Sequence, residues 1–282
     1  MRRRGKKREL YPILSTIIII LFLVFISSLV SATPAANVSS PFNYYFSSSG
    51  TLYESGSESE SSSPYFWLNS GAKLIISNGT GKTVQKELGS NDKWRLIYLS
   101  SNPIDTDNGY HPQNIFRLIT RSKWQNSQEI TYFKINKDHL SSSPNRDAYN
   151  GLLLISRYQN GDNLFYSGIR VDGNAIIKKK INGVYYTLSS KKVFSGIYDK
   201  NTNPNLLPKN TWIGLKTQIK NINGQTNIKL YMDKNKTGNW ALIAEANDNG
   251  TKYGKQIINE GYVGIRTDFM DVEFDDFSLK NI

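Results

Sequence analysis

Short apolar runs alternate with clusters of Asn, Gly, Asp and Ser along most of this sequence after residue 64. Four of these clusters are typical of tight β-turns, because Asn, Asp and Gly accept the positive φ angles that such turns require: 159–162, 172–174, 182–183 and 223–224. Turns of this kind join neighbouring antiparallel strands. The pattern therefore predicts sequential β-hairpins, and it predicts no amphipathic helix of about ten residues after residue 33.

The strands that this pattern predicts most clearly lie after residue 113. They cover 114–121, 130–136, 151–158, 164–171, 175–181, 184–188, 212–221, 226–233, 240–247, 261–267 and 271–280. An aromatic content of 12%, with 17 Tyr residues, also favours strands over helices. We therefore expect an all-β fold, a two-sheet antiparallel jelly-roll sandwich, preceded by an N-terminal apolar signal or anchor helix.

The N-terminus has the features of a segment that directs export. Residues 2–8 are rich in Arg and Lys, residues 13–30 are mostly apolar, and the small residues Ser31 and Ala32 follow. This order is typical of a cleaved signal peptide, although the apolar run is also long enough for an uncleaved membrane anchor. Both interpretations place the rest of the chain outside the cell, either secreted or anchored to the membrane.

Composition divides the chain into three parts: the signal or anchor (1–32), a linker and first strand with a Ser-rich loop (33–64), and a β domain (65–282). The net charge of +12 falls to +7 for residues 33–282, which keep 29 basic and 22 acidic residues. This excess permits an anionic partner, but nucleic acid is not expected for an exported protein. Because the chain has no Cys, disulfides cannot stabilise it.

The C-terminal part of the chain resembles a known superfamily in four segments. The first begins at Trp212, and the second, 228–233, leads into a turn that ends at Trp240. The third reads Gly-Tyr-Val-Gly-Ile from residue 261, and the fourth, 272–277, ends in Phe-Asp-Asp-Phe. Over residues 65–282 these segments resemble the concanavalin A-like lectin/glucanase superfamily, which includes laminin-G-like domains. The resemblance implies a jelly roll whose concave face is the carbohydrate site in lectins and glycosidases.

Alternation along the predicted strands places several basic side chains on shared faces. If these faces line one groove, they form a site suited to uronate carboxylates or sulfates and to sugar-ring stacking. The candidate ligand-binding residues are Arg117, Arg121, Arg157, Tyr166, Arg170 and Lys178, with Trp124 as an exposed aromatic. The alternative interpretation is a solvated outer face, because any half-exposed strand alternates polar and apolar residues.

The same residues include the types of group that a polysaccharide lyase needs. Such an enzyme neutralises a uronate carboxylate and removes a proton with Tyr or His, and Arg117, Tyr166 and His111 are the candidates for these catalytic roles. Alginate lyases, however, carry a Tyr-Phe-Lys-Ala-Gly strand and a Gln-Ile-His motif. This chain reads Leu-Phe-Tyr-Ser-Gly at 164–168 and has no Gln-x-His, which counts against lyase activity.

Three carboxylates alternate along the last predicted strand, at Asp271, Glu273 and Asp275. Their spacing differs from the Glu-x-Asp-x-x-Glu strand of the superfamily's glucanases, in which two carboxylates serve as acid and nucleophile. Two interpretations stay open: a structural Ca²⁺ site, or an exposed strand face with salt bridges. No other cofactor is predicted.

These features together predict an exported, lectin-like protein that binds a polysaccharide or cell-surface glycan, with acidic polysaccharides as candidates. One alternative is a polysaccharide-degrading enzyme, a lyase ahead of a glycoside hydrolase, and another is a structural or adhesion module. Tyr, His and Arg within about 3 Å of one another would favour the enzyme. A groove lined by Arg and aromatics without such a cluster would favour the binding protein, and a blocked face would favour the structural module.

Overall fold

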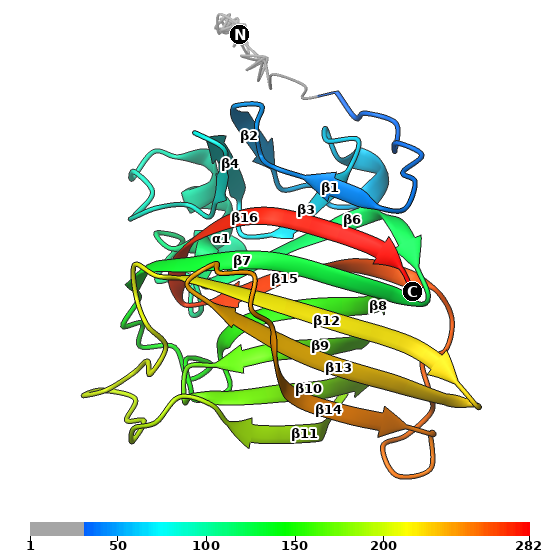
Figure 1. Cartoon of the computed structure of the whole chain (residues 1–282). Helices are drawn as coiled ribbons and strands as arrows, with labels where there is room; N and C mark the ends of the chain where they lie inside the picture. The colour runs from blue at the N-terminus through cyan, green and yellow to red at the C-terminus, as the bar shows by residue number, and fades with distance from the viewer. Residues whose placement is uncertain (1–30) are drawn as a thin grey trace, which may run out of the picture. The chain divides into compact units, whose positions relative to one another are not determined.

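Residues 31–282 are described by a computed structural model in which most of the chain forms β-strands (Figure 1). The strands of the first, nine-stranded sheet are β1 (Phe42–Tyr44), β2 (Gly50–Tyr53), β4 (Lys73–Ser77), β5 (Thr80–Lys82), β7 (Ser127–Asp138), β12 (Trp212–Ile222), β13 (Gln225–Lys234), β14 (Ala241–Asp248) and β16 (Met270–Asn281). The strands of the second, seven-stranded sheet are β3 (Phe66–Ser70), β6 (Ile115–Trp124), β8 (Gly151–Asn160), β9 (Asn163–Arg170), β10 (Asn174–Ile181), β11 (Val184–Lys192) and β15 (Gly261–Asp268).

The two sheets pack face to face, and Figure 1 shows the nine-stranded sheet in front of the seven-stranded one. The strand order is β14-β13-β12-β7-β16-β5-β4-β2 in the first sheet, with β1 also paired to β16, and β11-β10-β9-β8-β15-β6-β3 in the second. The pairs within both sheets are antiparallel. This confirms the expected two-sheet antiparallel sandwich.

Two of the predicted hairpin turns have the backbone geometry that their residues suggested. Asn182 and Gly183 join β10 to β11 with φ angles of 49° and 80°. Asn223 and Gly224 join β12 to β13 with φ angles of 50° and 73°. Two successive residues with positive φ match the right-handed twist of the strands that they connect. The sequence therefore determines these two strand pairings locally.

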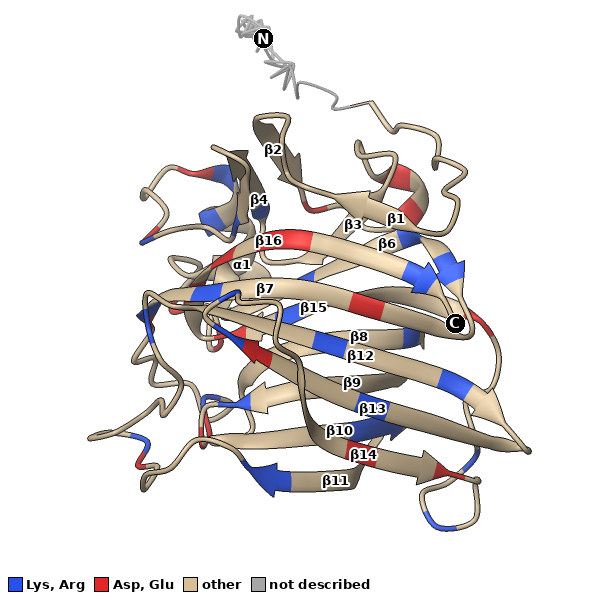
Figure 2. Cartoon of the chain, in the orientation of Figure 1, with Lys and Arg blue, Asp and Glu red and all other residues tan. Residues whose placement is uncertain are grey.

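Alternation along the strands fills the space between the sheets. On β12, Ile213, Leu215 and Ile219 are buried, whereas Lys216 and Gln218 are half-buried on the outer face. Figure 2 shows the basic positions along this strand. β8 is different, because its residues are buried from Gly151 to Tyr158 on both faces. Its inward side chains join the main core, and its outward ones join a second apolar cluster. The outer face of the seven-stranded sheet is therefore covered in part, and the site described below lies there.

Three short helical segments accompany the sheets: η1 (Glu58–Glu60), α1 (Lys93–Ser101) and η2 (Pro112–Asn114). The sequence did not predict α1, whose amphipathic pattern is weak because Leu96 and Ile97 are exposed. Its stability comes from Asp92, which accepts a hydrogen bond from the Trp94 amide at 2.8 Å, and from the burial of Trp94 and Tyr98.

The N-terminal part of the described chain is more ordered than the predicted linker and loop. The amide of Thr33 donates to the carbonyl of Ser61 at 2.9 Å, and η1 lies within the Ser-rich stretch 55–63. The predicted signal or anchor helix at 13–30 lies outside the described residues. Within residues 31–282, the helices are all too short or too polar to cross a membrane.

One core residue leads to a prediction about stability and pH. Glu129 on β7 is 1% exposed, and in residues 31–282 neither carboxylate oxygen has a hydrogen-bond partner. Burial raises the pKa of Glu129 well above its usual value. The folded state therefore keeps a proton that the unfolded state releases above about pH 4.3. The contribution of Glu129 to the free energy of unfolding is therefore most favourable below the unfolded-state pKa. It is lost as the pH rises through the folded-state pKa.

A Glu129→Met variant is therefore expected to be more stable than the unaltered protein at neutral pH, by about 1–3 kcal/mol. The gain should shrink near pH 4, where the unaltered carboxyl group is neutral in both states. Urea denaturation of both proteins at the two pH values measures this difference. Glu129→Gln serves as the control that removes the titration and keeps a polar group, and an equal gain at both pH values would contradict the prediction.

Candidate functional site

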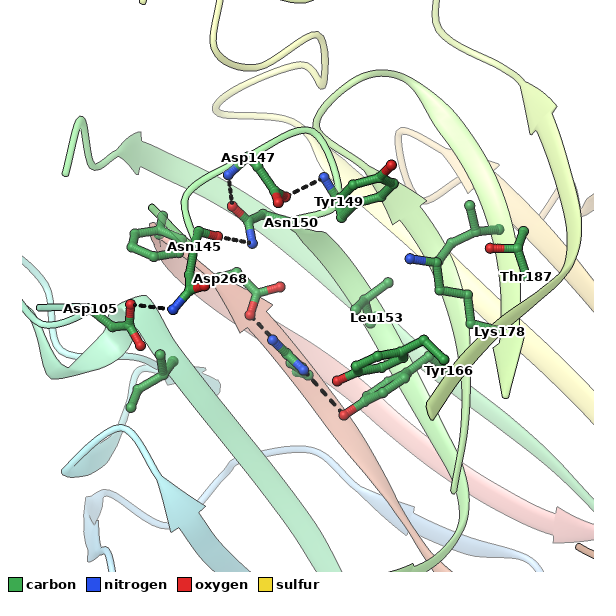
Figure 3. Close-up of a pocket in the computed structure, with 15 residues that line it drawn as sticks. Asp105, Asn145, Asp147, Tyr149, Asn150, Leu153, Tyr166, Lys178, Thr187 and Asp268 are labelled. Carbon is green, nitrogen blue, oxygen red and sulfur yellow. Dashed lines mark hydrogen bonds and ion pairs between the residues drawn. The ribbon is translucent and has the colours of Figure 1, made fainter. Parts of the chain in front are cut away.

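A hollow of about 540 Å³ opens on the face of the seven-stranded sheet that points away from the other sheet (Figure 3). Its floor comes from β8, β9, β10 and β15, and its wall comes from the segment between β7 and β8 and from β11. The lining residues are Asp105, Ile115, Asn145, Asp147, Tyr149, Asn150, Leu153, Tyr166, Ile176, Lys178, Tyr185, Thr187, Arg266, Asp268 and Phe269.

The register of neighbouring strands brings the floor residues together. Tyr166 on β9 lies opposite Lys178 on β10, and Arg266 on β15 lies opposite Leu153 on β8. Directly opposed residues in a sheet share one face, so these four side chains all point away from the main core. The predicted grouping of Tyr166 with Lys178 on one face is therefore present in the structure.

A hydrogen-bonded series crosses this floor. The Arg266 guanidinium donates to Asp268 at 2.8 Å through Nε and to the Tyr166 hydroxyl at 3.2 Å through Nη1 (Figure 3). Asp268 is 2% exposed, and this burial raises its pKa, although the charge of Arg266 acts in the opposite direction. The Arg266–Asp268 pair is thus neutral overall and holds the Tyr166 hydroxyl in place.

Lys178 lies among aromatic rings and, within residues 31–282, has no ion-pair partner. Its Nζ is 4.5 Å from the ring centre of Tyr149 and 5.9 Å from that of Tyr185. No carboxylate oxygen of residues 31–282 lies within 4.0 Å of this ammonium. Burial, together with the charge of Arg170, lowers the pKa of Lys178. The charged form of Lys178 is disfavoured because it is partly removed from water and has no counter-ion among the described residues. A bound anion would therefore stabilise the charged form.

Arg170 and Arg117 extend the basic face in two directions. Neither residue is among those that line the hollow. The Arg170 guanidinium is 4.5 Å from the ring centre of Tyr149, which belongs to the wall, and it is ion-paired with Asp172. Arg117 lies directly opposite Arg266 on the neighbouring strand β6. Its guanidinium is 5.5 Å from the ring centre of Tyr158, and in residues 31–282 its Nε has no hydrogen-bond partner.

Three of the predicted ligand-binding residues lie elsewhere, and irregular strand pairing is the reason. Three residues of β6 oppose one residue of β15 around position 121, which breaks the alternation. Arg121 is buried in an ion pair with Glu58 at 2.6 Å, and it also donates to the Ser63 carbonyl. Trp124, three residues later, is 5% exposed and belongs to the main core.

Arg157 is also a structural residue. It has a φ angle of 51° at a bulge in β8 and is completely buried. Its guanidinium donates to the carbonyls of Gln125 and Ile257 and to the side chain of Asn221, at 2.7–3.0 Å. Burial lowers the pKa of Arg157 to about 10. It therefore crosslinks loops beside the bulge and is not available to a ligand.

The structure places the predicted catalytic residues in two separate environments. Tyr166 and Arg117 belong to the face described above, but His111 is not among the residues that line the hollow. Its ring packs against that of His139, with 4.4 Å between ring centres, and its Nδ1 lies 3.0 Å from Asp107. The Tyr166 hydroxyl instead accepts a hydrogen bond from Arg266, which was not predicted from the sequence.

The carboxylates predicted as a calcium site have different partners. Asp271 contacts His139 at 2.8 Å, Glu273 contacts Lys134 at 2.7 Å, and Asp275 is ion-paired with Lys236. In the described part of the chain, no group of three or more His, Cys, Asp or Glu side chains has an arrangement that could hold a metal ion. Each of the three carboxylates thus has its own partner, and Asp271 is buried, whereas the sequence suggested an exposed face.

Several residues of the hollow were not predicted from the sequence. Arg266 and Asp268 alternate at the end of a predicted strand, so the period-two rule could have placed them on one face. Tyr185 also belongs to a predicted strand, and the same rule applies to it. Asp147 and Tyr149 lie in an irregular segment, for which alternation gives no information.

No family model matches the sequence, and no curated protein matches it. Among solved structures, the chain is similar to the winged bean acidic lectin, with 11% identity, a TM-score of 0.49, and coverage of 85% of this chain and 96% of that one. It is also similar to a Bacillus licheniformis β-glucanase, with 10% identity, a TM-score of 0.45, and coverage of 87% and 99%. A carbohydrate-binding module from Bacillus subtilis gives 13% identity, a TM-score of 0.41, and coverage of 60% and 83%. These likenesses concern the fold alone, and the chain's own strand order shows a two-sheet antiparallel sandwich.

Proposed function

We propose that this protein binds carbohydrate in the hollow on the outer face of the seven-stranded sheet. The observation that carries the proposal is the aromatic surround of Lys178, formed by Tyr149 and Tyr185, next to the fixed hydroxyl of Tyr166. Tyr rings offer apolar faces to a sugar ring and hydroxyls to its polar rim. Asn145 and Asp147 at the wall add side chains that can exchange hydrogen bonds with sugar hydroxyls.

The charges of this face favour a glycan with acidic groups. Arg170 and Arg266 are each paired with a carboxylate, whereas Lys178 and Arg117 have none within 4.0 Å in residues 31–282. A carboxylate or sulfate would give each of these two cations a charge-assisted hydrogen bond. The two cations lie on either side of Tyr166 and Arg266, as a linear acidic polysaccharide with repeated charges would require.

The proposed binding of a polysaccharide agrees with the export that the N-terminal sequence predicts. The basic residues 2–8 and the apolar run 13–30 support secretion or anchoring in a membrane. The partner would then be an extracellular polysaccharide or a cell-surface glycan, and the membrane would be a second partner if the segment stays uncut.

A second candidate function is cleavage of an acidic polysaccharide by a lyase reaction. The observation in its favour is the 3.2 Å contact between the Tyr166 hydroxyl and the Arg266 guanidinium. A lyase uses a Tyr hydroxyl to move a proton and a basic side chain to hold the uronate carboxylate, and here the two groups are in contact. Against this function stands the position of His111, which is not among the lining residues.

Three polymers distinguish these functions. Dextran sulfate and neutral dextran share a backbone and differ in charge, and alginate is a uronate polymer that lyases can cut. Retention on dextran sulfate and alginate, without new ultraviolet-absorbing unsaturated ends, supports a binding protein for acidic glycans. Equal retention on neutral dextran removes the preference for acidic groups, and release of unsaturated ends identifies a lyase. If none of the three polymers is retained or cut, the structural or adhesion module is favoured.

A further inference from the structure

The two His residues of the chain pack against each other with their rings tilted by 40°. His111 precedes η2 and His139 follows β7, and their ring centres are 4.4 Å apart. The side chain of His139 is 2% exposed and that of His111 is 15% exposed. Only His111 therefore has appreciable contact with water.

Both ring nitrogens of His139 lie close to oxygen atoms of neighbouring side chains. Nδ1 is 2.6 Å from Oδ1 of Asn114, whose Nδ2 donates to the Asp105 carbonyl, so that Oδ1 is left to accept. Nε2 is 2.8 Å from a carboxylate oxygen of Asp271. Burial acts to raise the pKa of Asp271, but the hydrogen bond and charge of His139 hold that pKa below its usual value. The ring of His139 and the Asp271 carboxylate thus lie in direct contact, and both are buried.

The His pair is connected to the wall of the hollow through Asp107. The Asp107 carboxylate contacts Nδ1 of His111 at 3.0 Å and accepts a hydrogen bond from the Ser141 hydroxyl at 2.5 Å. A few residues further on, Asn145 donates to Asp105 at 3.0 Å and lines the hollow. The segment from His139 to Asn150 is therefore fastened to the segment 105–111 at its start and near its middle.

The charged groups around His111 act in opposite directions. Asp107 at 3.0 Å and Glu87 at 3.8 Å favour protonation of His111. Burial and the positive charge of His139 disfavour it, and they prevail, so the pKa of His111 lies below its usual value. A base with a lowered pKa in the folded state stabilises the fold above the unfolded-state pKa of about 6.5, and that stability falls as the pH drops below this value.

We propose that the His111–His139 pair positions the wall of the hollow and makes glycan binding weaken at acidic pH. Protonation of His111 places a positive charge 4.4 Å from the ring of His139, whose charge opposes it, and separating the rings relieves the repulsion. Separation pulls on Asp107 and Ser141, and thereby on the segment that carries Asn145 and Tyr149. This inference rests on the proposed function of the hollow.

The test compares the unaltered protein with a His111→Asn variant, which keeps a donor for Asp107 and cannot titrate. Dextran sulfate is the probe, because its sulfates stay ionised between about pH 5 and about pH 7.5, on either side of the ordinary His pKa of about 6.5. We expect the unaltered protein to lose affinity several-fold at the lower pH, with an upper limit of about tenfold per unit by which the His111 pKa differs between the bound and free protein. The variant should lose markedly less.

Amide hydrogen exchange of residues 139–150, corrected for the intrinsic pH dependence, gives a readout that does not require a ligand. Faster exchange at the lower pH in the unaltered protein, and not in His111→Asn, supports the inference. Equal pH dependence of exchange in the two proteins overturns it. Absence of dextran sulfate binding at both pH values would count against the proposed function, while the exchange measurement would still decide whether the His pair holds the wall.

Discussion

A Lys178→Gln variant is expected to bind dextran sulfate about ten- to hundredfold more weakly than the unaltered protein, because a charge-assisted hydrogen bond contributes about 1.5–3 kcal/mol. Lys178 is the cation that lines the hollow without a carboxylate within 4.0 Å in the described residues. The substitution keeps most of the side-chain length, and its contacts with Tyr149 and Tyr185 are at the outer face and not in the main core. Thermal stability should therefore change little.

The matched control is Lys191→Gln on the adjacent strand β11, which removes the same charge from an exposed position. Affinity for dextran sulfate is measured by titration at low and moderate salt, because ordinary surface electrostatics is screened at the higher ionic strength. A loss of affinity that is as large for Lys191→Gln as for Lys178→Gln would mean that overall charge, and not the hollow, attracts the polymer.

The sequence predicted the C-terminal half of the sandwich well, because its pairing signals are local. The turns at 182–183 and 223–224 fix their hairpins through backbone conformation alone. The first five strands are only three to five residues long, so alternation is hard to detect in them. β1 pairs with β16 near the opposite end of the chain, and such a pairing has no local signal.

The site was predictable only where strands are regular. Tyr166 and Lys178 lie on continuous stretches of β9 and β10, and alternation placed both on the correct face. Arg121 and Arg157 lie at bulges, where extra residues on the strand break the regular alternation of side chains. A sequence does not distinguish a buried Arg that donates to acceptors within the protein from an Arg that binds a ligand. The surroundings of Arg121 and Arg157 come from loops that are far away along the chain.

Asp248→Asn is expected to destabilise the protein by about 3–5 kcal/mol, because it leaves a buried cation without its counter-ion. Asp248 at the end of β14 is 2.7 Å from Lys179 on β10, and both side chains are 0% exposed. Lys179 also donates to the carbonyls of Gly254 and Lys255, at 2.9 and 3.0 Å. The ion pair thus ties the nine-stranded sheet to the seven-stranded one and to the segment between β14 and β15.

Urea denaturation measures the loss, and Lys209→Gln provides the comparison with an exposed ion pair. Lys209 contacts Asp138 at the same distance of 2.7 Å, but its side chain is 49% exposed, so the expected loss is below about 1 kcal/mol. A double replacement of Lys179 by Met and Asp248 by Leu removes both charges and should recover much of the lost stability. If Asp248→Asn costs no more than Lys209→Gln, or if the double replacement is less stable than the single one, the Lys179–Asp248 pair does not hold the sheets together through its charge.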